Sequence, residues 1–310
     1  MQLINSGKLV IQRRRIPAAF IHLRTLFSTM KPNIVALTLV AAIAGGYVGA
    51  RGFVADWSVL AWLMVTLGLA TAGACMLNNV YDQDIDRLMG RTKSRAMAAG
   101  EISSTVVLVI GLLLAVVPLV LMAHTVNTLA ALLTAGAVFG YVVVYTIWAK
   151  RRTPWANQLG GIAGAMPPLV GCAAFTGGLN AEAFILFLIM VVWQQPHALT
   201  LALKYREEYA RAGVPVIPVA KGIAATKTRI VIYAALLVAV SILPYFMGMT
   251  GISYLIVALA SGLIFTAKSY RFMNSDKPYD MRLFLYTLMH FVLLFAGLLL
   301  NIRGEMVAVI

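Results

Sequence analysis

The sequence has very little acid and almost no cysteine. Only 11 of its 310 residues are Asp or Glu, against 25 Lys and Arg, and the chain has two cysteines. Two cysteines cannot form a disulfide framework, which excludes the small secreted scaffolds that depend on one. Charged residues make up 12% of the chain and hydrophobic residues 61%, and the mean hydropathy is +0.87. A soluble domain of this length could not keep so much apolar surface from water, so the composition predicts a polytopic membrane protein.

Nine apolar stretches are long enough to cross a bilayer. A span without water must satisfy its own backbone groups, which predicts an all-α bundle of nine transmembrane helices. We expect one membrane-embedded domain over residues 1–310, with residues 1–30 as an N-terminal cytoplasmic and interfacial segment. The predicted spans are 33–50, 57–80, 102–123, 126–148, 155–176, 181–203, 229–248, 252–269 and 283–302.

The formal net charge of +14 could suggest nucleic-acid binding, but the positions of the charges argue against it. With the N-terminus in the cytoplasm, every Lys and Arg except Arg51 and Arg303 falls on the cytoplasmic side. This asymmetry is the positive-inside rule, so the basic residues indicate topology and no nucleic-acid partner. The first 30 residues contain Arg13-Arg14-Arg15 and no apolar core that ends in small residues, so we expect no cleavable signal. We therefore expect a multi-pass protein of a bacterial cytoplasmic membrane.

An acidic segment lies where the second apolar stretch ends. Asn78, Asp82 and Asp86 follow at four-residue spacing and would share one helical face over roughly 12 Å. Magnesium prefers one or two carboxylates together with phosphate oxygens and water, and this face supplies that set. A solvated, charge-rich loop is the alternative, but it does not explain why Asn78 still belongs to an apolar helix. Asp84 points away from the other acids, and we expect it to be solvated.

Basic residues accompany the acids. Arg91, Lys93 and Arg95 come directly after them, and arginines can bind diphosphate oxygens in a bidentate manner. Tyr145 and Lys150, at the cytoplasmic end of the fourth span, are further candidates for contact with a diphosphate. The alternative for these two is an aromatic belt with positive-inside anchors.

A second polar constellation ends the sixth span. Gln194, Pro196 and His197 lie inside an apolar run, where they are costly unless they face a polar cavity. Pro196 removes a backbone hydrogen bond, so we expect the helix to open locally. His197 could orient a substrate, move a proton or contact a haem, and the alternative is a packing or capping histidine.

These parts together suit a lipid-soluble substrate that ends in diphosphate. Magnesium would neutralise the leaving diphosphate, and the allylic tail would separate as a carbocation in a dry pocket. Aromatic faces such as those of Tyr145 and Tyr205 could stabilise that cation. The acceptor must be apolar enough to enter from the bilayer, so the residues predict prenyl transfer. A secondary transporter is the alternative from another class, although transporters place such residues near the bilayer midplane.

The pattern Asn78-x-x-x-Asp82-x-x-x-Asp86, followed by Arg91-Thr92-x-x-Arg95, resembles the signature of the intramembrane, UbiA-type aromatic prenyltransferases. More narrowly, it resembles the branch of that family that farnesylates protohaem IX. Lys31-Pro32 and Trp193-Gln194-x-Pro196-His197 agree with that branch, and the likeness extends over about residues 28–290. Ala96, Ala198 and Glu208 depart from the commonest pattern of that branch, which has Pro, Phe and Asp at these positions.

The resemblance implies nine spans around a cavity open to the cytoplasmic face. It implies farnesyl diphosphate as donor, haem B as acceptor and magnesium as cofactor, with haem a substrate. The farnesyl group would join the 2-vinyl group of haem and water would add, giving haem O for terminal oxidases. The resemblance leaves open whether the product passes to a haem A synthase or to an oxidase, and a relative acting on a quinone precursor is the nearest alternative.

The candidate site follows from these motifs. Asn78, Asp82 and Asp86 would hold magnesium and, with His197 on the haem side, form the catalytic set. The candidate substrate-binding residues are Lys31, Arg91, Lys93, Arg95, Tyr145, Lys150, Gln194, Tyr205 and Glu208.

Overall fold

The computed structural model describes residues 18–52 and 56–302, and these form helices joined by short connections. Their only pairing of β type is an isolated bridge between Thr250 and Ile302. The elements are α1 (Ala18–Thr29), α2 (Pro32–Gly49), α3 (Trp57–Tyr81), α4 (Gln83–Leu88), α5 (Ser104–Thr125), α6 (Thr128–Phe139), the π-helix η1 (Gly140–Ala149), α7 (Ala156–Ala165), α8 (Pro167–Thr176), α9 (Ala181–Lys204), α10 (Arg206–Arg211), α11 (Ile217–Ala220), α12 (Gly222–Ser241), α13 (Leu243–Phe246), α14 (Ile252–Met273) and α15 (Met281–Leu300).

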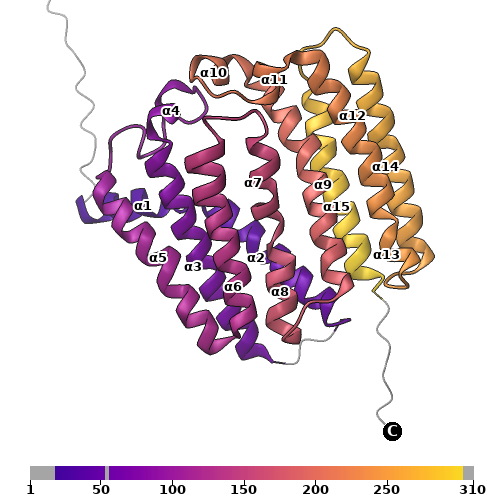
Figure 1. Cartoon of the computed structure of the whole chain (residues 1–310), viewed down its shortest axis with the longest axis horizontal. Coiled ribbons are helices and arrows are strands. Elements are labelled where there is room, and N and C mark those ends of the chain that lie inside the picture. The colour runs from indigo at the N-terminus through magenta and orange to yellow at the C-terminus, as the bar shows by residue number, and fades with distance from the viewer. Residues whose placement is uncertain (1–17, 53–55, 303–310) are drawn as a thin grey trace, which may run out of the picture.

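Nine helical segments of the described residues are long and apolar enough to cross a membrane, as predicted. They run side by side, and α4, α10 and α11 lie together at one end of the bundle (Figure 1). Helix α3 packs on α5, α2 on α8, and α12 on both α9 and α14. The protein is therefore an all-helical, multi-pass membrane protein. Of the predicted N-terminal segment, residues 1–17 lie outside the described residues, and α1 occupies most of the rest.

The seventh span begins earlier than the sequence predicts. We expected it at residue 229, but α12 begins at Gly222 and so includes Lys227 and Arg229. Lys227 donates from Nζ to the carbonyl oxygen of Ser275 at 2.6 Å, and Arg229 donates to the carbonyl oxygen of Ala225. Long basic side chains near a helix end can extend their charged groups to polar partners, so charge does not end the helix here.

The Pro167-Pro168 pair and Pro196 act differently on their helices. The fifth span is broken at Pro167-Pro168, since α7 ends at Ala165 and α8 begins at Pro167. The expected opening at Pro196 is wrong, because α9 continues through it as far as Lys204. Nε2 of Gln195 donates to the carbonyl oxygen of Val191 at 3.1 Å, next to the carbonyl of Val192 that Pro196 leaves without its helical donor.

Small residues let α2 and α8 touch. A Cβ atom on Gly171 would lie 1.7 Å from the carbonyl oxygen of Ala42, and one on Gly45 would lie 2.2 Å from Cα of Pro168. Only glycine permits so close a backbone approach, which is a common way of packing helices in membranes. The contact holds the broken fifth span against α2, the helix that follows Lys31.

Candidate active site

The acidic face forms at the junction of α3 and α4. The backbone N–H of Asp82 donates to the carbonyl oxygen of Asn78 at 2.9 Å, and that of Asp86 donates to the carbonyl oxygen of Asp82 at 2.8 Å. The four-residue helical register therefore continues across the junction, although α3 itself ends at Tyr81. All three side chains are buried, with residue exposures of 1–3%. A charged face so well shielded from water needs cations beside it.

Lys31 and Thr146 orient the Asn78 amide. Its Oδ1 accepts a hydrogen bond of 2.5 Å from Nζ of Lys31. Its Nδ2 donates to Oδ2 of Asp82 at 2.8 Å and to Oγ1 of Thr146 at 3.0 Å. Both amide hydrogens are in use, and the amide oxygen, which faces Lys31, keeps a second lone pair.

Asp82 has a buried ion pair and one free oxygen. Nζ of Lys150 lies 2.5 Å from Oδ2 of Asp82, with 15% and 1% of the two side chains exposed. Oδ1 of Asp82 is buried and has no hydrogen-bond partner among the described residues. Burial by itself lowers the pKa of Lys150, but Tyr145 and the Asp82 carboxylate outweigh burial and hold that pKa above its ordinary value.

Asp86 is paired with a residue of the predicted diphosphate set. Nη1 of Arg95 donates to Oδ2 of Asp86 at 2.8 Å and to Oδ1 at 3.1 Å. Oγ1 of Thr92 donates to the carbonyl oxygen of Asp86 at 3.1 Å and so ties the following loop to α4. The side chain of Arg95 is 33% exposed, so its guanidinium has room for a second anion.

Asp84 lies outside this buried set. It forms a two-bond ion pair with Arg151 at 2.7 Å, and its side chain is 61% exposed. The guanidinium of Arg151 lowers the pKa of Asp84 to about 2. The expectation that Asp84 points away from the other acids is confirmed, and its partner is a basic residue next to Lys150.

The π-helix η1 brings the fourth span to the acids. Its backbone bonds join residues five apart, as between the N–H of Lys150 and the carbonyl oxygen of Tyr145 at 2.9 Å. Residues five apart therefore lie one above the other, which puts Tyr145 above Lys150 and Tyr141 above Thr146. A Cβ atom on Gly160 would lie 2.6 Å from the Tyr145 ring, so glycine at that position makes room for it.

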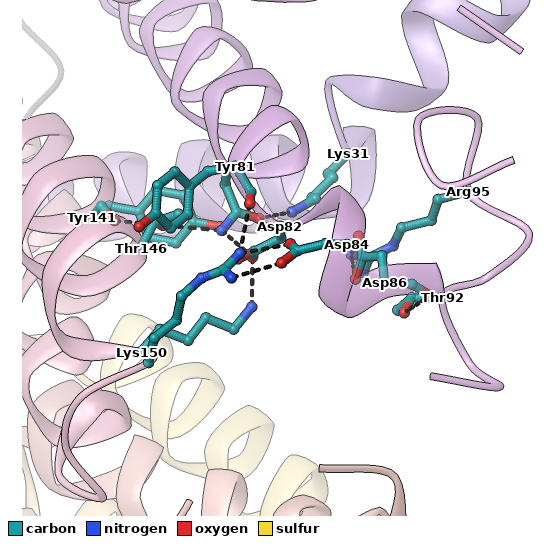
Figure 2. Close-up of polar contacts among 12 residues, drawn as sticks. Lys31, Tyr81, Asp82, Asp84, Asp86, Thr92, Arg95, Tyr141, Thr146 and Lys150 are labelled. Atoms are coloured by element: carbon teal, nitrogen blue, oxygen red, sulfur yellow. Dashed lines mark hydrogen bonds and ion pairs between the residues drawn. The ribbon is translucent and has the colours of Figure 1, made fainter. Parts of the chain in front are cut away.

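Lys31 reaches the site from a strained backbone position. It has a positive φ of 52° at the N-cap of α2, a conformation that non-glycine residues adopt rarely. Burial lowers the pKa of Lys31 to about 8. The side chains of Lys31 and Lys150 approach the segment around Asp82 from opposite sides (Figure 2).

The donor set fits magnesium. Among the described residues, no three or more His, Cys, Asp and Glu side chains gather into a metal cluster. Asn78, Asp82 and Asp86 nevertheless offer two carboxylates and an amide oxygen, and Oδ1 of Asp82 is a buried acceptor without a partner among the described residues. Magnesium sites commonly combine one or two carboxylates with substrate phosphates and water, so the residues present suit a metal that arrives with a diphosphate.

An apolar cavity begins one turn below the acids. Its volume is about 130 Å³, and its lining includes Cys75 of α3 and Tyr141 of η1. Leu67, Thr134 and Val170, further along their helices, line the end away from the acids. A cavity with this lining can hold a hydrocarbon tail whose polar head lies at Asn78 and Asp82.

His197 belongs to an aromatic cluster between α9 and α15. Its ring stacks on Trp193 and Phe284, with centroids 5.0 and 4.9 Å away. Its Nδ1 lies 2.8 Å from Oγ1 of Thr287, which already donates its hydrogen to the carbonyl oxygen of Phe284. Thr287 can therefore only accept, so Nδ1 of His197 carries the hydrogen and the neutral ring has a free lone pair on Nε2.

The other predicted site residues lie outside the acidic face and outside the aromatic cluster of His197. Arg91 lies over the Tyr205 ring at 5.3 Å, and Lys204 lies 5.2 Å from the same centroid. Oε2 of Glu208 is buried without a partner among the described residues. Gln194 donates to the carbonyl oxygen of Gly161 at 3.0 Å and so joins α9 to α7. Lys93 is exposed and forms no side-chain hydrogen bond or ion pair with the described part of the chain.

Sequence reasoning did not identify two residues that hold the site in place. Thr146 accepts a hydrogen bond from Asn78. An α-helix would turn residues five apart by about 140°, so the sequence did not predict that Thr146 faces the site. Thr287 accepts a hydrogen bond from His197, which lies 90 residues earlier in the chain, and no local sequence pattern predicts that contact. Nδ1 of the buried His290 lies 3.0 Å from Oγ of Ser261.

Comparison with known proteins identifies the family of this chain. The family model described as the UbiA prenyltransferase family matches residues 38–298. A protoheme IX farnesyltransferase of Aquifex aeolicus is 40% identical over 87% of this chain and 92% of its own length. One of Thioalkalivibrio sulfidiphilus is 39% identical over 90% and 92%.

Solved structures share the fold. A digeranylgeranylglyceryl phosphate synthase has a TM-score of 0.76 at 19% identity, covering 90% of this chain and 98% of its own. A UbiA homologue of Archaeoglobus fulgidus bound to GPP and Mg²⁺ has a TM-score of 0.67 at 16% identity, covering 88% and 99%. The family match spans most of the chain, and the relatives align over nearly their whole lengths. This chain is therefore a transferase that belongs to the UbiA prenyltransferase family.

Proposed function

We propose that this protein transfers the farnesyl group of farnesyl diphosphate to the 2-vinyl group of haem B, with addition of water, to give haem O. The observation that carries the proposal is the buried face of Asn78, Asp82 and Asp86, which lies one turn above an apolar cavity. The names of relatives at about 40% identity, protoheme IX farnesyltransferase, support haem as the acceptor. Family membership favours this function over a transporter.

The donor would lie with its head among the charged residues and its tail in the apolar cavity. Asn78, Asp82 and Asp86 would hold magnesium, which supplies charge neutralisation to the leaving diphosphate. Lys31, Arg95 and Lys150 would bind diphosphate oxygens, and Arg91 and Lys93 would bind from the loop. The attraction between each cation and its diphosphate oxygen becomes stronger as negative charge develops on the leaving group. These cations would therefore stabilise the transition state more than the bound donor.

Bond breaking and bond making would follow across the same cavity. The bond between C1 of the farnesyl group and its oxygen breaks, and the electron pair leaves with the diphosphate. The rings of Tyr141 and Tyr145 stack with centroids 5.7 Å apart, and their π-faces would stabilise the allylic cation. The vinyl π-electrons form the new bond to C1, which leaves a cation on the vinyl carbon attached to the porphyrin. Water adds to that carbon and loses a proton, giving the hydroxyethylfarnesyl side chain.

His197 would act on the acceptor side. Its free Nε2 lone pair can accept the hydrogen bond of the added water or contact the haem, while Thr287 holds the opposite nitrogen. The apolar faces of Trp193 and Phe284 beside it suit a flat macrocycle. Gln194, Tyr205 and Glu208 would contribute to binding from the same end of α9 and from the segment after it.

We propose that the site faces the cytoplasm, because almost every Lys and Arg of the sequence falls on that side of the predicted spans. We further propose that residues 1–310 form one membrane-embedded prenyltransferase domain.

The test uses purified protein in nanodiscs with magnesium, haem B and farnesyl diphosphate, followed by mass analysis of the pigment. A haem heavier by a farnesyl group plus water supports both donor and acceptor. Unmodified haem, together with prenylation of a quinone precursor under the same conditions, would move the assignment to the other branch of the family. Omission of magnesium is the control for metal dependence.

A further inference from the structure

A polar cavity lies beside the candidate active site and shares no lining residue with the apolar tail cavity. Its volume is about 350 Å³, and it lies between α1 and the segment that follows α4. Lys31 and Arg95 line it, but each already has a partner, Asn78 and Asp86 respectively. The proposed function therefore leaves the rest of this cavity without a role.

Three polar groups of the cavity lining have no partner. Arg24 and Glu101 are exposed, and neither forms an ion pair or side-chain hydrogen bond within residues 18–52 and 56–302. Asn79 is only 3% exposed, and its Nδ2 donates to the carbonyl oxygen of Thr29 at 2.7 Å. Its Oδ1 is buried and lacks a donor. Buried acceptors in proteins are nearly always satisfied, so this oxygen points to a ligand that carries a donor.

An apolar groove adjoins the cavity. It is lined by Leu23, Leu26, Ile102 and Val106, and Glu101 lines both the groove and the cavity. Leu23 and Val106 are 65% and 47% exposed. Helix α1 contacts α3 and lies across the direction of the spans (Figure 1). An apolar strip beside a polar cavity at the end of a transmembrane bundle suits an amphiphile from the surrounding leaflet.

We propose that this cavity and groove bind one phospholipid of the phosphatidylethanolamine type. Arg24 binds the phosphate diester, and the ammonium donates to Glu101 and to Oδ1 of Asn79. An acyl chain lies along Leu23 and Val106. Apart from Lys31 and Arg95, which the proposed function assigns to the diphosphate, the lining offers one cation and one anion, and these match a zwitterionic head group. Phosphatidylcholine has the same charges but no donor for Asn79, and phosphatidylglycerol has no cation for Glu101.

The test measures lipid binding to the full-length, delipidated protein in detergent, by native mass spectrometry with each lipid titrated separately. We expect one phosphatidylethanolamine per chain, bound about tenfold more tightly than phosphatidylcholine or phosphatidylglycerol, since one charge-assisted hydrogen bond differs between them. Neither donor nor acceptor is present, so the result does not depend on the proposed function.

Two variants and a matched control assign the contacts. Arg24→Gln should weaken the binding of all three lipids about tenfold. Glu101→Gln should abolish the preference for phosphatidylethanolamine over phosphatidylglycerol. Arg152→Gln removes an exposed arginine of the same face that lines neither cavity and should change nothing. Equal binding of the ethanolamine and choline lipids would overturn the proposal. Unchanged lipid binding by Arg24→Gln would overturn it as well.

Discussion

Nζ of Lys150 lies 2.5 Å from Oδ2 of Asp82, a residue 68 positions earlier in the chain. Both groups are shielded from water, so either charge alone would be costly. The other oxygen of Asp82 has no partner among the described residues. The carboxylate is thus balanced on one side and free to accept a cation on the other, which is the arrangement expected where a metal and a diphosphate bind together.

The buried acids and the exposed acid should differ in importance for turnover. Asp82→Asn and Asp86→Asn should each lower kcat by about 1,000-fold or more. Each removes a carboxylate that would hold magnesium, and magnesium would neutralise the leaving diphosphate. Asp84→Asn is the matched control, since Asp84 is exposed and pairs with Arg151. Farnesyl-transfer assays on detergent-purified variants, with expression levels compared, provide the measurement. Near-normal activity in Asp82→Asn would exclude it as a metal ligand.

Magnesium should stabilise the protein more when Lys150 is lost. Lys150→Met leaves Asp82 buried and unpaired, which we expect to cost about 3–5 kcal/mol of folding free energy without metal. Magnesium with diphosphate should recover part of that loss, because a second cation then faces Asp82. Thermal unfolding with and without the metal measures this, with Arg152→Gln as control. An equal magnesium effect on Tm in both variants would argue against metal at Asp82.

Thr287 should act on haem use through His197. His197→Ala should raise KM for haem while leaving KM for farnesyl diphosphate nearly unchanged. Thr287→Val removes the acceptor for Nδ1–H and should have the same selective effect, about tenfold, since one hydrogen bond to the ring is lost. Thr287→Ser keeps the hydroxyl and should restore wild-type kinetics. A change in donor KM in place of acceptor KM would remove His197 from the acceptor side.

Thr134 should limit the length of the donor tail. It is 1% exposed and lines the far part of the apolar cavity, so Thr134→Phe would fill space that a long tail needs. We expect kcat/KM for farnesyl diphosphate to fall about tenfold relative to geranyl diphosphate, consistent with the loss of contacts for one isoprene unit. Leu132→Phe, on the same helix at a site that is 65% exposed, is the control. Parallel losses for both donors would mean that the tail lies elsewhere.

The contact between α2 and α8 should govern stability. Gly171→Ala would place a methyl group 1.7 Å from the carbonyl oxygen of Ala42, so we expect a loss of about 3 kcal/mol or more. Gly136→Ala, in α6 with nothing within 4 Å of the new Cβ, should stay within about 1 kcal/mol of the parent. Thermal unfolding in one detergent compares the two. A Tm for Gly171→Ala equal to the parent's would contradict the close approach.

Much of the site could be predicted because it is local. Asn78, Asp82 and Asp86 belong to one helical register, and that register persists across the α3–α4 junction. The nine spans could be predicted as well, since length and hydropathy decide which helices can cross a bilayer. The start of the seventh span was missed, because basic residues near its beginning are typical of a loop. In the structure these residues are helical, and Lys227 and Arg229 donate to the backbone oxygens of Ser275 and Ala225.

The sequence by itself determined the membrane class, the acidic face and the basic residues that accompany it, since each depends on composition or short spacing. Only the tertiary structure decided which cation meets which acid. Lys31 reaches Asn78, Lys150 reaches Asp82 and Arg95 reaches Asp86. The physical reason is that these contacts depend on a π-helical register, a strained residue before α2 and the packing of distant helices, none of which a local pattern encodes.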